Sequence, residues 1–199
     1  MRRRQDRKGE GGGFLLLVKH SLPEIEEQVP ASQWHLSARG RRSCWPLAEE
    51  LAPYAPDLLV CSLEPKAVET AQIVGDQLGI PVRPLPGLHE HERRTVTFLS
   101  RQEFEACAAK FFANPSGLVF GEETAEQAGE RFSRSIISAL AKHNSRNLAV
   151  ISHGTVITLF VAQANQIEPF SFWKSLGLPS LVVLKLPGME LKTVVEEID

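Results

Sequence analysis

Short apolar runs alternate along the chain with longer segments in which apolar residues recur at helical spacing. The first run, Phe14–Val18, contains five apolar residues in a row, and two similar runs lie within Asp57–Ser62 and Asn147–Ser152. Runs this short and this apolar are typical of strands that are buried on both faces of a parallel sheet. A shorter extended piece is expected at Ile80–Leu85, and we expect all four segments to belong to one sheet.

The segments between and after these runs predict helices. Ser37 has the character of an N-cap for a helix that ends near Ala52, and Pro46 inside that helix predicts a kink or a break. Further helices are predicted over Pro65–Leu78, Arg101–Phe112, Thr124 to about His143, Thr155 to about Ala164, and Pro169–Leu176.

The end of the chain, Ser180–Leu186 and Met189–Ile198, predicts a hairpin that turns at Pro187-Gly188. Strands that alternate with helices indicate an α/β fold of three layers, α/β/α, with a mostly parallel central sheet. The hairpin would add its strands at one edge of that sheet.

Length and composition favour a single folded domain. The chain has 199 residues, of which 43% are apolar and 23% are charged, as in soluble globular proteins. Residues 1–13 contain five basic and two acidic residues, have no apolar residue after Met1, and end in a glycine run. We therefore expect a disordered basic tail over residues 1–13 and one domain over residues 14–199.

The same features bear on partners and location. The net charge of −2 favours neither nucleic acid nor a membrane surface, and no window reaches the roughly 20 apolar residues of a membrane span. The amino-terminal segment lacks the apolar stretch of a secretion signal. Cys44, Cys61 and Cys107 are odd in number and share no metal-ligand spacing, as expected of thiols in a reducing cytoplasm. The sequence leaves the oligomeric state open.

Polar residues that suit an anion site follow all three buried runs. Lys19 and His20 follow the first, Ser62 the second with Lys66 one helical turn later, and His153-Gly154 the third. The carboxyl ends of parallel strands share one edge of a sheet, where ligands of open α/β folds bind. Gly154 at the start of a helix would also offer free backbone N–H groups. This convergence of two histidines and two lysines predicts an anionic ligand, most simply one with a phosphoryl group.

The order of these motifs resembles the histidine phosphatase superfamily, the phosphoglycerate-mutase-like enzymes. Lys19-His20-Ser21 stands where the family has Arg-His-Gly, and Ser62–Ala71 stands where it has Ser-x-x-x-Arg-Ala-x-x-Thr-Ala. Leu88-His89-Glu90 is similar to the family's Leu-x-Glu motif, and Ser152-His153-Gly154 to its Ser-His-Gly. Leu36–Gly40 is similar to the family's Leu-Thr-x-x-Gly helix start. The resemblance extends over nearly all of the chain from Phe14 onward.

The resemblance implies a role for each matched residue. His20 would attack phosphorus to form a phosphohistidine, and His153 would stabilise the transferring group. Glu90, with a pKa raised by its site, would protonate the leaving oxygen and later activate water, and Glu92 or another nearby acid is the alternative. Phosphate would be bound by Lys19, Lys66, Ser62 and Gly154. The reaction implied needs no metal and no cofactor, and its substrate would be a small phosphorylated metabolite.

Three departures from the family pattern leave alternatives open. Lys19 and Lys66 replace both signature arginines, and Ser21 replaces the signature glycine. Lysine is a mobile point charge where arginine is a rigid fork. A phosphatase is favoured over a mutase, because no feature marks a bisphosphoglycerate-primed enzyme. The alternatives are a silent protein of the same fold that binds a phosphorylated ligand, and a metal site built from His20, His153 and Glu90. Arg93, Arg94 and Arg101, in the predicted lid between His89 and Gly121, are candidate contacts for a second anionic group, although the pattern favours the interpretation that they are simply exposed.

Overall fold

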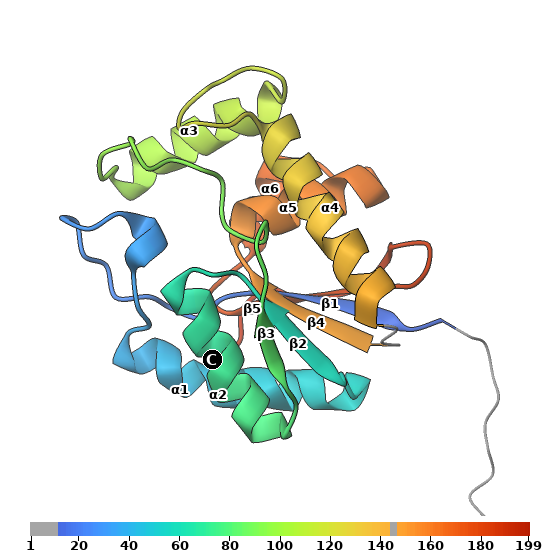
Figure 1. Ribbon diagram of the computed structural model, residues 1–199. Helices are drawn as coiled ribbons and strands as arrows, with labels where there is room; N and C mark the ends of the chain where they lie inside the picture. The colour runs from blue at the N-terminus through green and yellow to red at the C-terminus, as the bar shows by residue number, and fades with distance from the viewer. Residues whose placement is uncertain (1–11, 144–146) are drawn as a thin grey trace, which may run out of the picture.

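A six-stranded sheet forms the centre of the computed structural model, which describes residues 12–143 and 147–199 (Figure 1). The strand order is β3-β2-β4-β1-β5-β6. The first four of these are parallel to one another, β5 is antiparallel to β1, and β6 is antiparallel to β5. The strands are β1 (Phe14–Lys19), β2 (Leu58–Cys61), β3 (Val82–Pro84), β4 (Asn147–Ser152), β5 (Ser180–Lys185) and β6 (Glu190–Val195). The predicted mostly parallel sheet with a carboxy-terminal hairpin at one edge is confirmed.

Helices cover both faces of the sheet. Helices α1 and α2 pack on one face, and α4, α5 and α6 pack on the other (Figure 1). Helix α3 lies beyond the second face and contacts α6. The helices are α1 (Ala38–Leu51), α2 (Pro65–Leu78), α3 (Arg101–Ala113), α4 (Ala125–His143), α5 (Gly154–Asn165) and α6 (Pro169–Ser175), with single 3₁₀ turns at Ala31–Gln33 and Ala52–Tyr54. The three-layer α/β/α fold is therefore confirmed.

The first strand shows why the apolar runs have no polar positions. Leu15 and Leu17 face the layer of α4 and α5, while Leu16 and Val18 face the layer of α1 and α2. All four side chains are fully buried. A strand that has helices on both sides has no solvent-facing position, so polar residues appear only where the strand ends.

The helix boundaries follow the predicted signals closely. The Ser37 side chain accepts a hydrogen bond from the Gly40 N–H at the start of α1, and Gly79 ends α2 with a φ of 66°. The predicted break at Pro46 is wrong, because α1 continues through it as one helix. Proline removes one backbone hydrogen bond, to the carbonyl of Arg42, and that residue is exposed, so water can satisfy the carbonyl.

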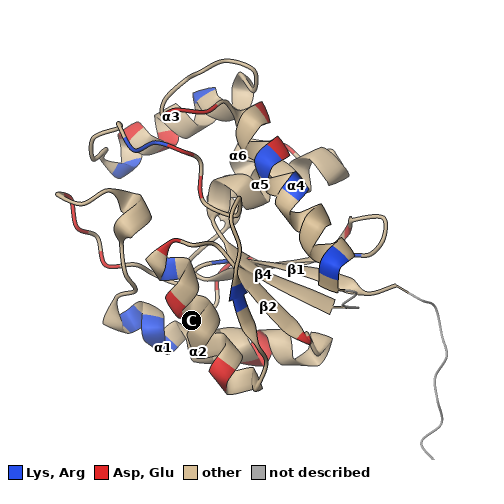
Figure 2. Cartoon of the chain, viewed as in Figure 1, with Lys and Arg blue, Asp and Glu red and all other residues tan. Residues whose placement is uncertain are grey.

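Two other predictions concern the ends and the surface. Residues 1–11 of the predicted tail over residues 1–13 lie outside the described residues. Gly13 belongs to the described part, and its carbonyl accepts a hydrogen bond from the Leu186 N–H. Among the described residues, no helix combines the length and the apolar character that crossing a membrane requires. Acidic and basic residues are interspersed over the molecule, and Arg39, Arg41 and Arg42 gather on α1 (Figure 2).

Gly40 allows α1 to pack directly on the loop that follows β1. A Cβ atom at Gly40 would lie 2.0 Å from the Leu22 carbonyl oxygen, which no real side chain tolerates. The Gly40 carbonyl in turn accepts a 2.7 Å hydrogen bond from the Ser21 hydroxyl. The backbone next to His20 is thus fixed by a contact that only glycine permits.

We expect Gly40→Ala to lower the free energy of unfolding by about 1–3 kcal/mol, because α1 or the loop must shift to accept the methyl group. The melting temperature measured by circular dichroism should fall by several degrees. Gly188→Ala is the matched control, since a Cβ atom there meets nothing within 4 Å. Equal melting temperatures for Gly40→Ala and the unchanged protein would contradict this account of the loop.

Candidate active site

Backbone hydrogen bonds hold the carboxyl ends of β1, β4 and β2 side by side. The His20 N–H donates to the Ser152 carbonyl at 2.9 Å, and the Ser62 N–H donates to the Ile151 carbonyl at 3.0 Å. His20 directly follows β1, Ser62 directly follows β2, and His153 directly follows β4. The structure therefore brings these three side chains to one point on the sheet edge.

The two histidine rings lie against each other in the interior. Their centroids are 5.1 Å apart with planes at 64°, and the exposed fractions are 7% for His20 and 0% for His153. Burial lowers the pKa of His20 well below its usual value, and the charges of His153 and Lys66 lower it further. Burial is also the largest cause that lowers the pKa of His153, with Lys66 second. The lowered pKa values favour the neutral form of both rings at pH 7.

A backbone contact fixes the tautomer of His20. Its Nδ1 lies 2.8 Å from the Ser21 carbonyl oxygen, which can only accept a hydrogen bond. In the neutral ring Nδ1 therefore carries the proton and Nε2 has a free lone pair. This is the form of histidine that can act as a nucleophile.

His153 is oriented by Ser62. Its Nε2 lies 2.8 Å from the Ser62 hydroxyl, and the same nitrogen lies 3.5 Å from a carboxylate oxygen of Glu64. Within the described residues its Nδ1 is buried without a hydrogen-bond partner. The ring thus presents one edge to the polar side chains that follow β2.

Each of the two lysines is engaged by a protein group. Lys66 is buried, and its ammonium donates to the Ala31 carbonyl and to the Glu64 carboxylate, both at 2.5 Å. The Lys19 ammonium donates to the Leu176 carbonyl at 2.5 Å, and its carbon chain lies over Gly154. Burial lowers the pKa of Lys19 to about 8, although the nearby carboxylate of Glu90 opposes this change.

Glu90 reaches the same site from the segment that follows β3. One carboxylate oxygen accepts the His91 N–H at 2.9 Å, and the other accepts the Thr155 N–H at the start of α5 at 3.2 Å. We expected the backbone N–H groups beside Gly154 to be free, but the Glu90 carboxylate accepts one of them, that of Thr155.

The expected rise in the pKa of Glu90 is wrong, because the structure lowers it. Burial acts to raise this pKa, but the guanidinium of Arg93, the neighbouring His153 and the His91 N–H together outweigh burial. The alternative acid, Glu92, instead pairs with His89 at 3.2 Å and is one-third exposed.

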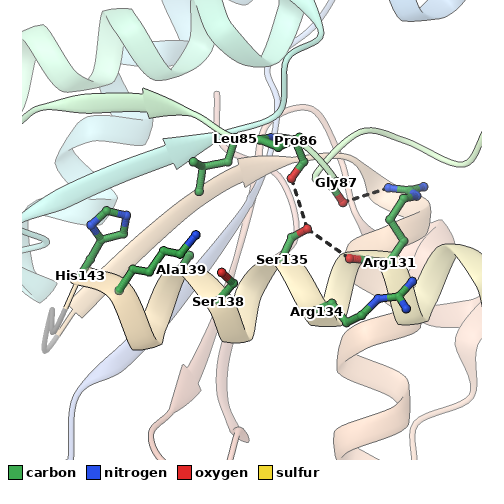
Figure 3. A pocket seen from close by; sticks show the side chains of 10 residues that line it. Leu85, Pro86, Gly87, Arg131, Arg134, Ser135, Ser138, Ala139 and His143 are labelled. Atoms are coloured by element: carbon green, nitrogen blue, oxygen red, sulfur yellow. Dashed lines mark hydrogen bonds between the residues drawn. The ribbon is translucent and has the colours of Figure 1, made fainter.

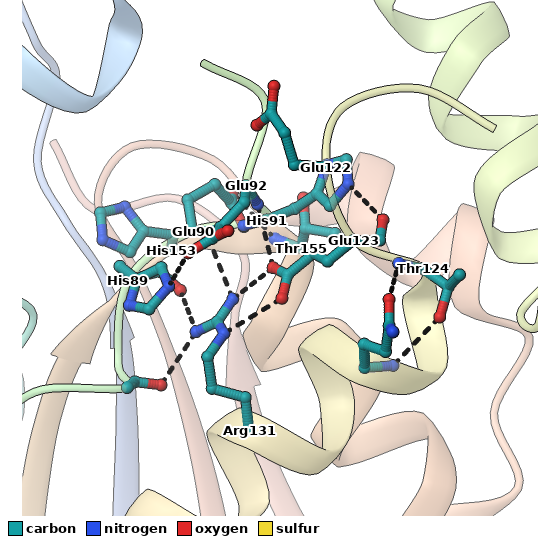
Figure 4. Close-up of polar contacts among 12 residues, drawn as sticks. His89, Glu90, His91, Glu92, Glu122, Glu123, Thr124, Arg131, His153 and Thr155 are labelled. Carbon is teal, nitrogen blue, oxygen red and sulfur yellow. Dashed lines mark hydrogen bonds and ion pairs between the residues drawn. The ribbon is translucent and has the colours of Figure 1, made fainter. Parts of the chain in front are cut away.

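Arg131 on α4 holds the segment that carries Glu90 (Figure 4). Its guanidinium donates to the carbonyls of Gly87 and His89 at 2.9 Å and to that of Glu90 at 3.2 Å. The same group pairs with Glu123 at 2.5 Å. Three backbone acceptors and one carboxylate thus converge on a single cation.

The segment that precedes α4 completes this network. Glu123 accepts the Glu92 N–H at 2.9 Å (Figure 4). Glu122 accepts the N–H groups of Arg94 and Thr95 at 2.7 and 2.8 Å. The position of Glu90 is therefore set by side chains about thirty to forty residues further along the chain.

Three residues of the site were not identified from the sequence: Glu64, Glu123 and Arg131. Glu64 lies inside the Ser62–Ala71 motif, but an acid just before a helix is ordinary there. Arg93 was a candidate together with Arg94 and Arg101; its guanidinium lies 4.6 Å from the centre of the Phe104 ring, with a buried nitrogen that lacks a partner within the described residues. Arg94 and Arg101 are exposed.

A surface cleft of about 370 Å³ lies elsewhere, where residues 85–87 pass α4 (Figure 3). Its lining residues are Leu85, Pro86, Gly87, Arg131, Arg134, Ser135, Ser138, Ala139, Lys142 and His143. None of the predicted site residues is among them, so we place the candidate site at the strand ends. No three His, Cys, Asp or Glu side chains of the described residues are grouped as metal ligands would be.

Several solved structures have the same fold at low sequence identity. YhfR of Bacillus stearothermophilus is 18% identical and has a TM-score of 0.75, with 94% of this chain and 98% of that one covered. A mycobacterial glucosyl-3-phosphoglycerate phosphatase is 20% identical with a TM-score of 0.70 (94% and 98% covered). A putative α-ribazole-5′-P phosphatase from Escherichia coli is 19% identical with a TM-score of 0.68 (94% and 96% covered).

A search of curated protein sequences found no match. The family comparison is more specific than the structural likeness, because one family model matches residues 15–196. That range includes both histidines, both lysines and the segment that carries Glu90. The chain belongs to the histidine phosphatase superfamily, branch 1.

Proposed function

We propose that the protein hydrolyses a small phosphomonoester through a phosphohistidine at His20, without a metal ion. One observation carries this proposal: the buried, neutral ring of His20 lies beside His153 where β1 and β4 end. Its Nδ1 faces the Ser21 carbonyl, which leaves the lone pair of Nε2 free. Membership of the histidine phosphatase superfamily supports phosphatase activity. The mycobacterial phosphatase of similar fold has been solved in complex with inorganic phosphate, which supports a phosphate ligand here.

The first step would transfer the phosphoryl group to His20. Nε2 attacks phosphorus, the bond from phosphorus to the ester oxygen breaks, and that oxygen takes a proton as the alcohol leaves. Lys66 and His153 would stabilise the charge on the transferring oxygens. In the second step water attacks phosphorus, its proton goes to a base, and phosphate leaves with His20 restored.

Glu90 is the candidate for both proton transfers, although its pKa is lowered in the ligand-free site. A phosphoryl group that enters beside Glu90 places negative charge next to a carboxylate, and like charge raises the pKa of a carboxyl group. Glu90 would therefore take up a proton as the substrate binds, and would be able to donate it to the leaving oxygen.

The arrangement of the lysines favours a second candidate function, a silent protein that binds a phosphorylated ligand. Lys66 donates to two protein oxygens and Lys19 donates to one, so protein groups already take up part of the capacity of each ammonium to hold a transferring phosphoryl group. Labelling of His20 by a radioactive phosphomonoester distinguishes a phosphatase from such a binding protein.

Phosphate release from a panel of phosphorylated sugars, phosphoglycerates and p-nitrophenyl phosphate tests the proposal. We expect His20→Ala to lose about 10³-fold or more in kcat on any substrate that is hydrolysed, because the nucleophile is removed. Rapid quenching should trap a phosphohistidine in the unchanged protein and none in the variant. Equal release by the two proteins would exclude His20 as the nucleophile.

The pKa of Lys19 predicts an alkaline limit of activity. Lys19 is cationic below about pH 8 and neutral above it, so kcat/KM should fall as the pH rises through about 8. Lys19→Arg keeps its charge in this range and should extend the plateau beyond pH 9. A decline that is the same in both proteins would assign the limit to another group. The profile is measured from pH 7 upward, where the phosphoester is already fully ionised.

Arg131 is a positioning residue for Glu90 in this scheme. Lysine cannot reach three carbonyls and a carboxylate at once, so we expect Arg131→Lys to lower kcat by about 10- to 100-fold, with a smaller change in KM. Arg134→Lys on the same helix is the matched control, since that side chain is exposed. Steady-state kinetics that leave kcat unchanged in Arg131→Lys would show that the network does not act on the reacting groups.

A further inference from the structure

Glu64 is a buried acid at the centre of the site, and the reaction scheme above does not use it. Its exposed fraction is 9%, and it directly precedes α2. Its side chain makes no capping hydrogen bond to that helix. Glu168, at the same position before α6, accepts hydrogen bonds from the Phe170 and Ser171 N–H groups. The carboxylate of Glu64 has instead turned into the site.

Three groups that suit an anion surround this carboxylate. One oxygen accepts from the Lys66 ammonium at 2.5 Å, and the other accepts the Glu90 backbone N–H at 2.9 Å. The second oxygen also lies 3.5 Å from Nε2 of His153. An ammonium, a backbone N–H and an imidazole edge are the kinds of donor that a phosphoryl oxygen uses.

The charge around Lys66 leads to the same conclusion. Lys66 and Glu64 form a buried pair with no net charge, so the pair as it stands offers little attraction to a dianion. A phosphoryl group placed beside Glu64 would meet a carboxylate at hydrogen-bond range, and like charges at that distance repel strongly away from water. The single positive charge of Lys66 is balanced by Glu64, so it stabilises a phosphoryl dianion fully only when that carboxylate has moved away.

We propose that the Glu64 carboxylate occupies the anion subsite of the protein, so that a phosphoryl group binds only when it displaces that carboxylate from Lys66. The inference rests on the proposed phosphoryl site, but it does not require turnover. Glu64 then sets the affinity of this subsite. Its displacement lowers the affinity for inorganic phosphate, which gains affinity from this subsite alone, whereas the organic part of a phosphoester can offset the cost through further contacts.

The local structure allows the displacement. Because the side chain does not cap α2, its movement leaves the start of that helix intact, and the Glu64 N–H stays bonded to the Ser62 hydroxyl at 3.2 Å. Pro65 also presets the first turn of α2. Only the contacts to Lys66, His153 and Glu90 are exchanged, and an incoming phosphoryl oxygen can replace each of them.

Titration calorimetry with inorganic phosphate at pH 7 tests this inference. Glu64→Gln keeps the shape of the side chain and removes its charge, and Glu64→Ala removes the group altogether. We expect both variants to bind phosphate about 10- to 100-fold more tightly than the unchanged protein, the range expected when one charged contact is released. Asp76→Asn, an exposed acid on the last turn of α2, loses the same charge far from the site and should bind as the unchanged protein does.

The double variant Glu64→Gln with Lys66→Met identifies the partner, since the gain in affinity should disappear when the released ammonium is absent. Thermal unfolding of each variant shows that it is folded. Equal or weaker phosphate binding by both single variants would overturn the inference. These outcomes are independent of catalysis: failure of the phosphohistidine to form contradicts the proposed function, whereas tighter binding by the variants would still identify Glu64 as the occupant of the subsite.

Discussion

The backbone hydrogen bonds between the carboxyl ends of β1, β4 and β2 are the constraint on which the candidate site depends. They fix the residues after three strands with buried apolar side chains, and so they hold the rings of His20 and His153 5.1 Å apart. Because side chains alternate along a strand, a shift of β1 by one residue would exchange its two buried faces. The positions of the two histidines therefore depend on the register of the sheet.

Much of the fold could be predicted because its signals are local and periodic. The apolar runs of β1, β2 and β4, the cap at Ser37 and the glycine after α2 each determine a boundary within a few residues of themselves. The convergence of His20, Ser62 and His153 also follows from a general property of parallel sheets. These residues could be placed together without knowing the path of any loop.

The parts that were missed depend on loops and on long-range contacts. Arg131 acts on carbonyls more than forty residues earlier in the chain, and no spacing within the sequence connects them. The expectation that the site raises the pKa of Glu90 was wrong for the same reason. Burial alone would raise it, and the backbone N–H and the Arg93 guanidinium that reverse the change are brought there by the path of the loop. Glu64 was overlooked because a carboxylate before a helix has an ordinary structural use.

The place of β1 inside the sheet has a consequence for motion. The strand is paired on both sides, with β4 and with β5, so its amides can exchange with solvent only when the sheet itself opens. The segment that carries Glu90 is held mainly by side chains, those of Arg131, Glu122 and Glu123, and such attachments open at a lower free energy. Local opening of the segment that carries Glu90 would thus leave the imidazole of His20 in place, and amide exchange would be faster in that segment than in β1.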